Sequence, residues 1–81
     1  MFVVSKKIDC RNLYDPLPLL ALRKALVLLR PGQIIELLSN DPGAPSDFRA
    51  WCEMTGHELL EVCDNVDHFG ILIRCCKHVK E

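Results

Sequence analysis

The sequence predicts a single α+β domain spanning residues 1–81, a two-layer sandwich in which two helices cover one face of a four-stranded mixed sheet. Its 81 residues suffice for one core and are too few for two. Apolar patterns with strand and helix periods alternate along the chain in the order β-α-β-α-β-β. A strand–helix–strand unit makes a parallel pair, whereas two consecutive strands can form a hairpin, so the sheet should be mixed.

The first two strands are expected at residues 2–10 and 33–38. The segment "FVVSKKIDC" is rich in β-branched residues and places Ile8 and Cys10 on the same face. The run "QIIELL" is short, apolar and bounded by turn residues, which is typical of a buried strand.

The first helix is expected from Pro16 to Arg30. Asp15 is a favoured N-cap, proline is tolerated in the first turn, and the following "PG" is a strong stop signal. Ten of these fifteen residues are Leu, Val or Ala, although a helix on one side of a sheet needs only one apolar stripe. The side chains predicted to face the sheet are Leu19, Leu22, Leu26 and Leu29.

The remaining apolar side chains of this helix should point elsewhere, with Lys24 among them; they are Leu17, Leu20, Val27 and Leu28. Two explanations stay open. Some of these residues can pack against the second helix, and the others would form an exposed apolar patch of the kind that marks a partner or homodimer surface.

The second half of the chain contains a loop, a helix and two strands. The loop "SNDPGAPSD" (39–47) is rich in turn formers, and either Asp41 or Ser46 can cap a helix running through "DFRAWCEMT" to Gly56. Strands are expected at "HELLEVC" (57–63) and, after the turn "DNVD", at "HFGILIRCC" (68–76). Alternation in the last strand puts one set on the helix side, namely Phe69, Ile71, Ile73 and Cys75. The opposite set is His68, Leu72, Arg74 and Cys76.

Composition narrows the possible functions. A net charge of −1 argues against direct nucleic-acid binding, which needs a concentrated basic field. The start "MFVVSKK" lacks the order of a signal peptide, and no apolar run approaches the ~20 residues that span a bilayer, so we expect no membrane association. Five cysteines without a secretion signal indicate reduced thiols. The predicted location is therefore the cytoplasm.

Four segments together resemble the TusA/SirA-like small sulfur carriers: "IDCRNLYDPLPLLALRKAL", "RPGQIIELLSNDP", "DFRAWCEMTGHELLEV" and "FGILIR". The resemblance covers nearly the whole chain and implies the same two-layer sandwich. It also implies a sulfur-relay role, in which the cysteine of a Cys-Pro-x-Pro motif accepts persulfide sulfur from a cysteine desulfurase. A downstream acceptor then receives the sulfur, for example in tRNA thiolation or molybdenum-cofactor work.

The motif cysteine is replaced in this chain. Pro16 and Pro18 are retained, but Asp15 occupies the cysteine position. A thiolate there would be stabilised by the helix dipole and free N–H groups, which lower its pKa. A carboxylate keeps the negative charge but cannot form a persulfide. Although the resemblance is to sulfurtransferases, the sequence leaves open whether this protein is an enzyme.

Another thiol could take over the sulfur. Cys10 lies five residues upstream, but its strand alternation favours core packing. Cys76 should face away from the helices, beside the cations Arg74 and Lys77, which would lower a thiol pKa. The candidate thiols are therefore Cys76 and Cys10. Cys52 is expected in the core, and Cys63 is undetermined.

The sequence gives little support for a metal site or for the common catalytic and phosphate-binding motifs. Cys63, His68 and the segment "CCKH" (75–78) offer soft ligands, yet no C-x-x-C pair is present, so no metal site is predicted. A catalytic triad order, an acid/base pair and a phosphate-binding glycine loop are also missing, and no cofactor is expected. His57 is expected to have a local structural role.

Two functions follow from these patterns. The first is a non-enzymatic binding or regulatory module, which docks on a sulfur-relay protein through Asp15, Pro16, Pro18, Leu17, Leu20 and Lys24. The second is an active sulfur carrier whose thiol has moved to Cys76 or Cys10. A homodimer sealed by the leucine-rich helix is compatible with either function.

Overall fold

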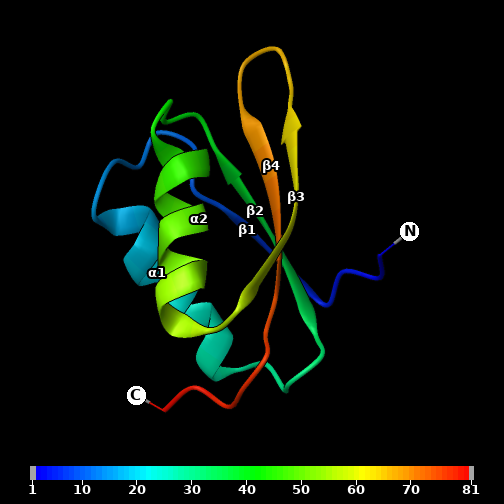
Figure 1. Cartoon of the computed structure of the whole chain (residues 1–81). Coiled ribbons are helices and arrows are strands. Elements are labelled where there is room, and N and C mark those ends of the chain that lie inside the picture. The colour runs from blue at the N-terminus through cyan, green and yellow to red at the C-terminus, as the bar shows by residue number, and fades with distance from the viewer. Residues whose placement is uncertain (1, 81) are drawn as a thin grey trace.

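The computed structural model describes residues 2–80 and has the predicted element order. The elements are β1 (Lys6–Asp9), α1 (Leu17–Val27), β2 (Ile34–Ser39), α2 (Ala44–Thr55), β3 (Glu58–Asp64) and β4 (Phe69–Arg74). Figure 1 shows the sheet as one layer and both helices as a second layer on the same side. The predicted two-layer sandwich is confirmed.

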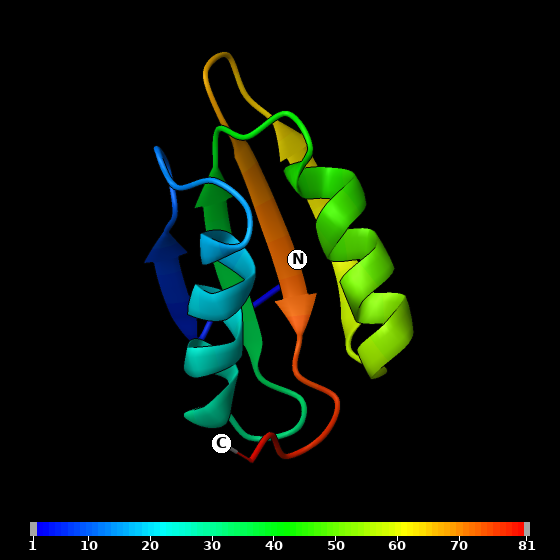
Figure 2. The same ribbon diagram turned by 90° about the vertical axis from the view of Figure 1, so that its left-hand side faces the viewer.

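The sheet is mixed, with the strand order β1-β2-β4-β3. β1 pairs parallel with β2, whereas β4 pairs antiparallel with both β2 and β3. The strands β1, β2 and β3 therefore run in one direction. Because α1 and α2 connect these three strands, both helices return in the opposite direction and begin at the same end of the molecule (Figure 2).

One row of side chains crosses the sheet and shows how the alternation builds the core. Ile8 is paired with Leu37, Leu37 with Ile71, and Ile71 with Val62. Leu37 and Ile71 are fully buried, and the two residues on the edge strands pack against the same core. A one-residue slip of any strand would turn its member of the row to the other face, so this row fixes the register.

The helix α1 covers the sheet with the stripe that the sequence predicts. Leu22 and Leu26 have no exposed surface, Leu29 is buried just beyond the helix, and Leu19 is partly buried against the core. Each fully buried leucine contributes roughly 1.5–3 kcal/mol of transfer free energy. The two helices pack on the sheet, and contact between them is sparse.

The start of α1 differs from the prediction. The helix begins at Leu17, with Pro16 in the N-cap position, and no side chain caps it. A cap by Asp15 would need the N–H of Leu17 or of residue 18. The Leu17 N–H instead donates to the Tyr14 carbonyl at 2.9 Å, and Pro18 has no N–H. Asp15 is therefore not a capping residue, and the prediction of a cap was wrong.

The helix α2 begins three residues earlier than predicted, at Ala44. Its N-cap position is Gly43, and neither Asp41 nor Ser46 caps it. The Asp41 carboxylate accepts a hydrogen bond from the Gly43 N–H at 2.9 Å, which closes the turn before the helix. The predicted end is confirmed, because Gly56 adopts a left-handed conformation with φ of 86°.

The strands β1 and β4 are shorter than the sequence suggests. Residues 2–5 are exposed and precede β1, although Ser5 still donates a backbone hydrogen bond to the Ile34 carbonyl at 2.8 Å. β4 ends at Arg74, and the buried Cys75 continues the ladder through its N–H to the Gln33 carbonyl at 2.8 Å. Within residues 2–80, no helix is long and apolar enough to cross a bilayer.

Candidate functional site

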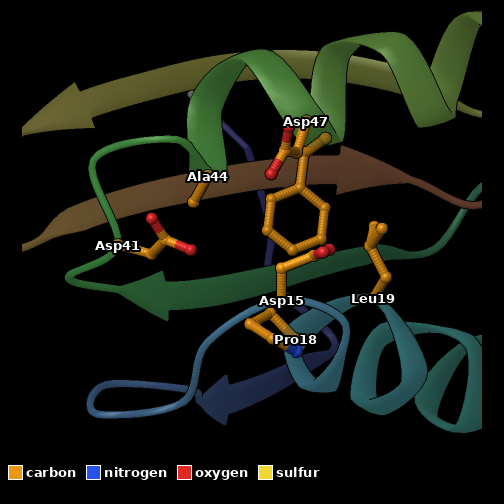
Figure 3. A pocket seen from close by; sticks show the side chains of 7 residues that line it. Asp15, Pro18, Leu19, Asp41, Ala44 and Asp47 are labelled. Carbon is orange, nitrogen blue, oxygen red and sulfur yellow. The ribbon is translucent and has the colours of Figure 1, made fainter.

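A small cavity lies between the starting ends of the two helices. Its volume is about 10 Å³, roughly the room of one water molecule. Figure 3 shows Asp15 and Pro18 on the α1 side and Asp41, Ala44 and Asp47 on the α2 side. The full lining consists of Asp15, Pro18, Leu19, Asp41, Ala44, Asp47 and Phe48.

Three carboxylates meet at this cavity, which we call the acidic end. Asp15 precedes α1, Asp41 closes the turn before α2, and Asp47 lies in the first turn of α2. Both helix N-termini direct the positive ends of their dipoles to this end of the molecule, which favours negative charge. Phe48, only 1% exposed, closes the cavity toward the core.

Sequence reasoning identified Asp15 but did not bring Asp41, Asp47 and Phe48 to the same place. The available signal was that both helices begin with a proline in the first turn, preceded by an aspartate within a few residues. Recognising that both helices start at one end of the sheet would have placed these carboxylates together.

The exposed side of α1 continues from the acidic end and carries the apolar residues predicted to point away from the sheet. Leu17 and Leu20 are each 50% exposed, and Lys24 is exposed on the same side of the helix. A shallow hollow of about 170 Å³ follows, lined by Leu20, Arg23, Lys24 and Val27. We call Asp15, Leu17, Leu20 and Lys24 the α1 face.

The two prolines of the motif lie differently. Pro16 is exposed before the helix, whereas Pro18 is buried and lines the cavity beside Leu19. Pro18 therefore positions the entrance of α1 and offers no surface to a partner.

Three of the five cysteines belong to the core. Cys10, Cys52 and Cys75 are at most 3% exposed. Burial raises the pKa of the Cys52 thiol to about 11, and it also raises the pKa values of Cys10 and Cys75. The negative charge of Asp9 adds to the rise at Cys10. Thiolates, the nucleophilic form, are therefore disfavoured at these three positions.

The other two cysteines, Cys63 and Cys76, are exposed. The Cys76 backbone N–H donates to Nδ1 of His57 at 3.1 Å, which holds this residue beside the start of β3. One of the cations expected to flank it is engaged elsewhere, because the Arg74 guanidinium pairs with Glu58 at 2.6 Å. Cys76 lies at the end of the molecule where the helices finish, because its partner His57 directly follows α2, whereas Asp15 lies at the end where the helices begin.

The cysteine and histidine side chains considered for metal binding are dispersed. His68 Nδ1 lies 2.7 Å from Asp67 at the β3–β4 turn, whereas Cys75 is in the core. Within residues 2–80, no group of three or more His, Cys, Asp or Glu side chains is placed to hold a metal ion.

Known proteins are similar to this chain over most of its length. Residues 6–75 match the family model described as sulfurtransferase TusA. The chain is 37% identical over 70 residues to a candidate sulfur carrier protein of Neisseria meningitidis, a match that covers 86% of this chain and 95% of that protein. It is 35% identical over 70 residues to the sulfur carrier protein TusA of Allochromatium vinosum, covering 86% and 92% of the two chains.

A solved structure supports the fold independently. The crystal structure of the SirA-like protein from Desulfitobacterium hafniense superimposes with a TM-score of 0.76, covering 89% of this chain and 99% of that chain. The sequence identity is 19%, so this likeness concerns the fold alone. With the family model and the two sequence relatives, these matches show that the chain belongs to the TusA (SirA-like) family of sulfur carrier proteins.

Proposed function

We propose that this protein is a binding or regulatory module of a sulfur relay, which docks on a relay protein without carrying sulfur at residue 15. The observation behind this proposal is the exposed carboxylate of Asp15 at the entrance of α1, where the resemblance places the persulfide-accepting cysteine. The partner would be a cysteine desulfurase or a downstream sulfur acceptor in the cytoplasm. Neither a membrane nor a nucleic acid is required.

The chemistry of the carboxylate supports docking without transfer. An aspartate carries its negative charge throughout the neutral range, as a low-pKa thiolate would, but it has no sulfur to which a second sulfur can bond. A partner that recognises an anion at the start of α1 would therefore bind the Asp15 carboxylate in place of a cysteine thiolate. Such a module would occupy the partner's site and compete with sulfur-loaded relatives.

The α1 face provides the remaining contact surface. Leu17 and Leu20 place two half-exposed apolar side chains beside the anion, and Lys24 adds a cation one turn further along. Apolar residues at the centre and charges at the rim are typical of protein interfaces. A second copy of this chain could bury the same leucines, so a homodimer is the alternative occupant of this face.

A second function has one observation in its favour. Cys76 is exposed, and the cation Lys77 follows it directly in the sequence, so an active carrier could use this thiol in place of residue 15. Cys10 is a poor substitute because it is 1% exposed and burial raises its pKa. A desulfurase bound over Asp15 would not reach Cys76 at the other end of the molecule.

Sulfur loading separates the two functions. We would incubate the purified protein with a cysteine desulfurase and cysteine, and measure intact masses before and after reduction. The expected result is no added sulfur on the native protein. The Asp15→Cys variant should gain the reducible mass of one sulfur atom, which shows that the donor engages this entrance. Reducible sulfur on the native protein that disappears in Cys76→Ser would establish the active carrier instead.

Docking is tested through the two leucines. Leu17→Asp combined with Leu20→Asp should weaken binding to the desulfurase at least about tenfold, because each substitution removes apolar contact worth on the order of 1 kcal/mol. Leu28→Asp is the matched control, since Leu28 is 73% exposed just past the end of the same helix. Equal loss in control and test variants would exclude the α1 face. Light scattering of the same proteins measures their molar mass and so shows whether a homodimer forms.

A further inference from the structure

A second surface lies where the helices end, and nothing in the proposed function uses it. It is an open groove of about 440 Å³ between the helical layer and the C-terminal segment that follows β4. Its lining combines residues of α1, α2 and the chain after β4, namely Arg23, Trp51, Met54, Thr55, His57, Lys77, His78, Val79 and Lys80. We call it the basic groove.

The charged side chains that line the basic groove are all positive. Arg23, Lys77 and Lys80 are cations at neutral pH, and no carboxylate of residues 2–80 lines the groove. A Cβ placed on Gly56 would lie 3.8 Å from the Lys77 ammonium, so this cation sits over the C-terminal end of α2. Helix C-termini carry partial negative charge, which attracts the Lys77 ammonium. Because the helices end here, no helix N-terminus supplies backbone N–H donors to the groove.

The floor of the groove is flat and is formed by two stacked aromatic rings. The rings of Trp51 and His57 stack with centroids 5.5 Å apart and an interplanar angle of 13°. Nδ1 of His57 accepts the Cys76 N–H, so the neutral ring carries its proton on Nε2. Burial lowers the His57 pKa, and the nearby charge of Lys77 lowers it further, which keeps the ring neutral. Met54 and Val79 supply apolar surface beside this floor.

We propose that the basic groove binds an acidic peptide segment of a partner protein, with one apolar side chain of that segment lying on the Trp51–His57 floor. Carboxylates of the segment would pair with Arg23, Lys77 and Lys80. Arginine receives a carboxylate through two parallel hydrogen bonds, and lysine acts as a point charge. This site is independent of the α1 face, so it can exist whether or not the function proposed above is correct.

An extended segment fits the groove better than a compact anion. The cations come from separate elements, Arg23 from α1 and two lysines from the C-terminal segment, and apolar residues share the lining with them. A single phosphate or sulfate ion typically binds in a smaller, fully polar site, often one formed by the N–H groups of a helix N-terminus. A segment with several carboxylates and an apolar side chain matches a lining that combines several cations with apolar surface.

The only tryptophan of the chain makes the proposal directly measurable. A capped hexapeptide with four carboxylates, one phenylalanine and one leucine would be titrated into the whole protein while Trp51 fluorescence is recorded. We expect a saturable change that weakens as salt is added, since exposed charge pairs are screened. The basic hexapeptide with the same apolar residues should give no saturable change. Equal responses to both peptides would overturn the proposal.

Two further arms test the residues and the type of ligand. Lys77→Glu with Lys80→Glu should weaken acidic-peptide binding at least about tenfold, and the milder Arg23→Gln should weaken it several-fold. Arg30→Glu with Arg49→Glu is the control, because it changes net charge equally at exposed residues outside the groove. Equal weakening in the control would contradict the site. Displacement of the peptide by equimolar citrate or benzoate would assign the groove to small anions and overturn the peptide proposal.

Discussion

The two ends of the helical layer have opposite charge and opposite shape. Where α1 and α2 begin, three carboxylates surround a cavity of about 10 Å³ that Phe48 closes from below. Where the helices finish, cations surround an open groove of about 440 Å³. Both helices run the same way, so their dipoles add, and each end carries the charge that complements its dipole.

The difference teaches which end is constrained by packing. At the acidic end, the helix starts, two first-turn prolines and a fully buried phenylalanine fix the geometry around Asp15. At the basic end, the C-terminal segment crosses an open groove, and of the residues that line it His57 alone is buried. Residue 15 therefore lies on an entrance fixed by buried residues, whereas the groove is shaped largely by long, exposed side chains.

The largest predicted effect tests this contrast in packing. Phe48→Ala should lower the free energy of unfolding by about 3–5 kcal/mol, because Phe48 is 1% exposed and truncation leaves a cavity. Trp51→Ala should cost less than half of that, since Trp51 is only partly buried in the floor of the groove. Urea unfolding followed by far-ultraviolet circular dichroism measures both, without relying on tryptophan fluorescence.

An 81-residue chain has roughly 4–12 kcal/mol of stability, so Phe48→Ala could leave too little folded protein to measure. Phe48→Leu retains most of the volume and should show the same direction at a smaller cost. If Trp51→Ala were as damaging as Phe48→Ala, both ends would be equally constrained and the contrast would fail.

A second prediction concerns the pH dependence of the basic end. The pKa of His57 is lowered in the folded protein, first by burial and then by Lys77, whereas the unfolded chain titrates near 6.5. The unfolded state therefore binds more protons between the folded pKa and about 6.5. Stability from this residue is complete above that range and is lost as the pH falls through it.

His57→Gln isolates this contribution. The glutamine oxygen can still accept the Cys76 N–H, but the side chain does not titrate. The loss of unfolding free energy between pH 7 and pH 5 should be smaller in the variant than in the native protein. An unchanged loss would mean that His57 is accessible to protons in the folded state, contrary to its 7% exposure.

The contrast between the two ends also explains which features of the structure could be predicted from the sequence. Periodicity correctly placed Leu22 and Leu26 against the sheet and Leu17 and Leu20 outside it, because burial of a helical stripe depends on local spacing. The cap at Asp15 was predicted wrongly, since a neighbouring proline removed the donor that a cap needs.

Long-range placement was beyond the sequence patterns. Asp41 and Asp47 come close to Asp15 only because both helices start at one end of the sheet. Residues 77–80 have no strand or helix period, so nothing local indicated that they would fold back over Trp51 and form one wall of the groove. Both sites depend on tertiary position, which spacing along the chain does not encode.

The smallest predicted effect concerns the carboxylates of the acidic end. Asp47→Asn removes a charge from the first turn of α2 and should cost about 0.3–1 kcal/mol at low salt. Asp15→Asn should cost less, because Asp15 lies outside α1 and does not cap it. The double variant should be less stable than the sum of the two losses predicts, because each single variant already removes the whole repulsion between the two carboxylates and the sum counts that relief twice. Chemical unfolding of the four proteins at low and high salt measures this coupling, which should vanish at high salt. Coupling of the opposite sign would mean that Asp15 and Asp47 support each other, for instance by sharing a proton, and that the acidic end does not present separate charges to a partner.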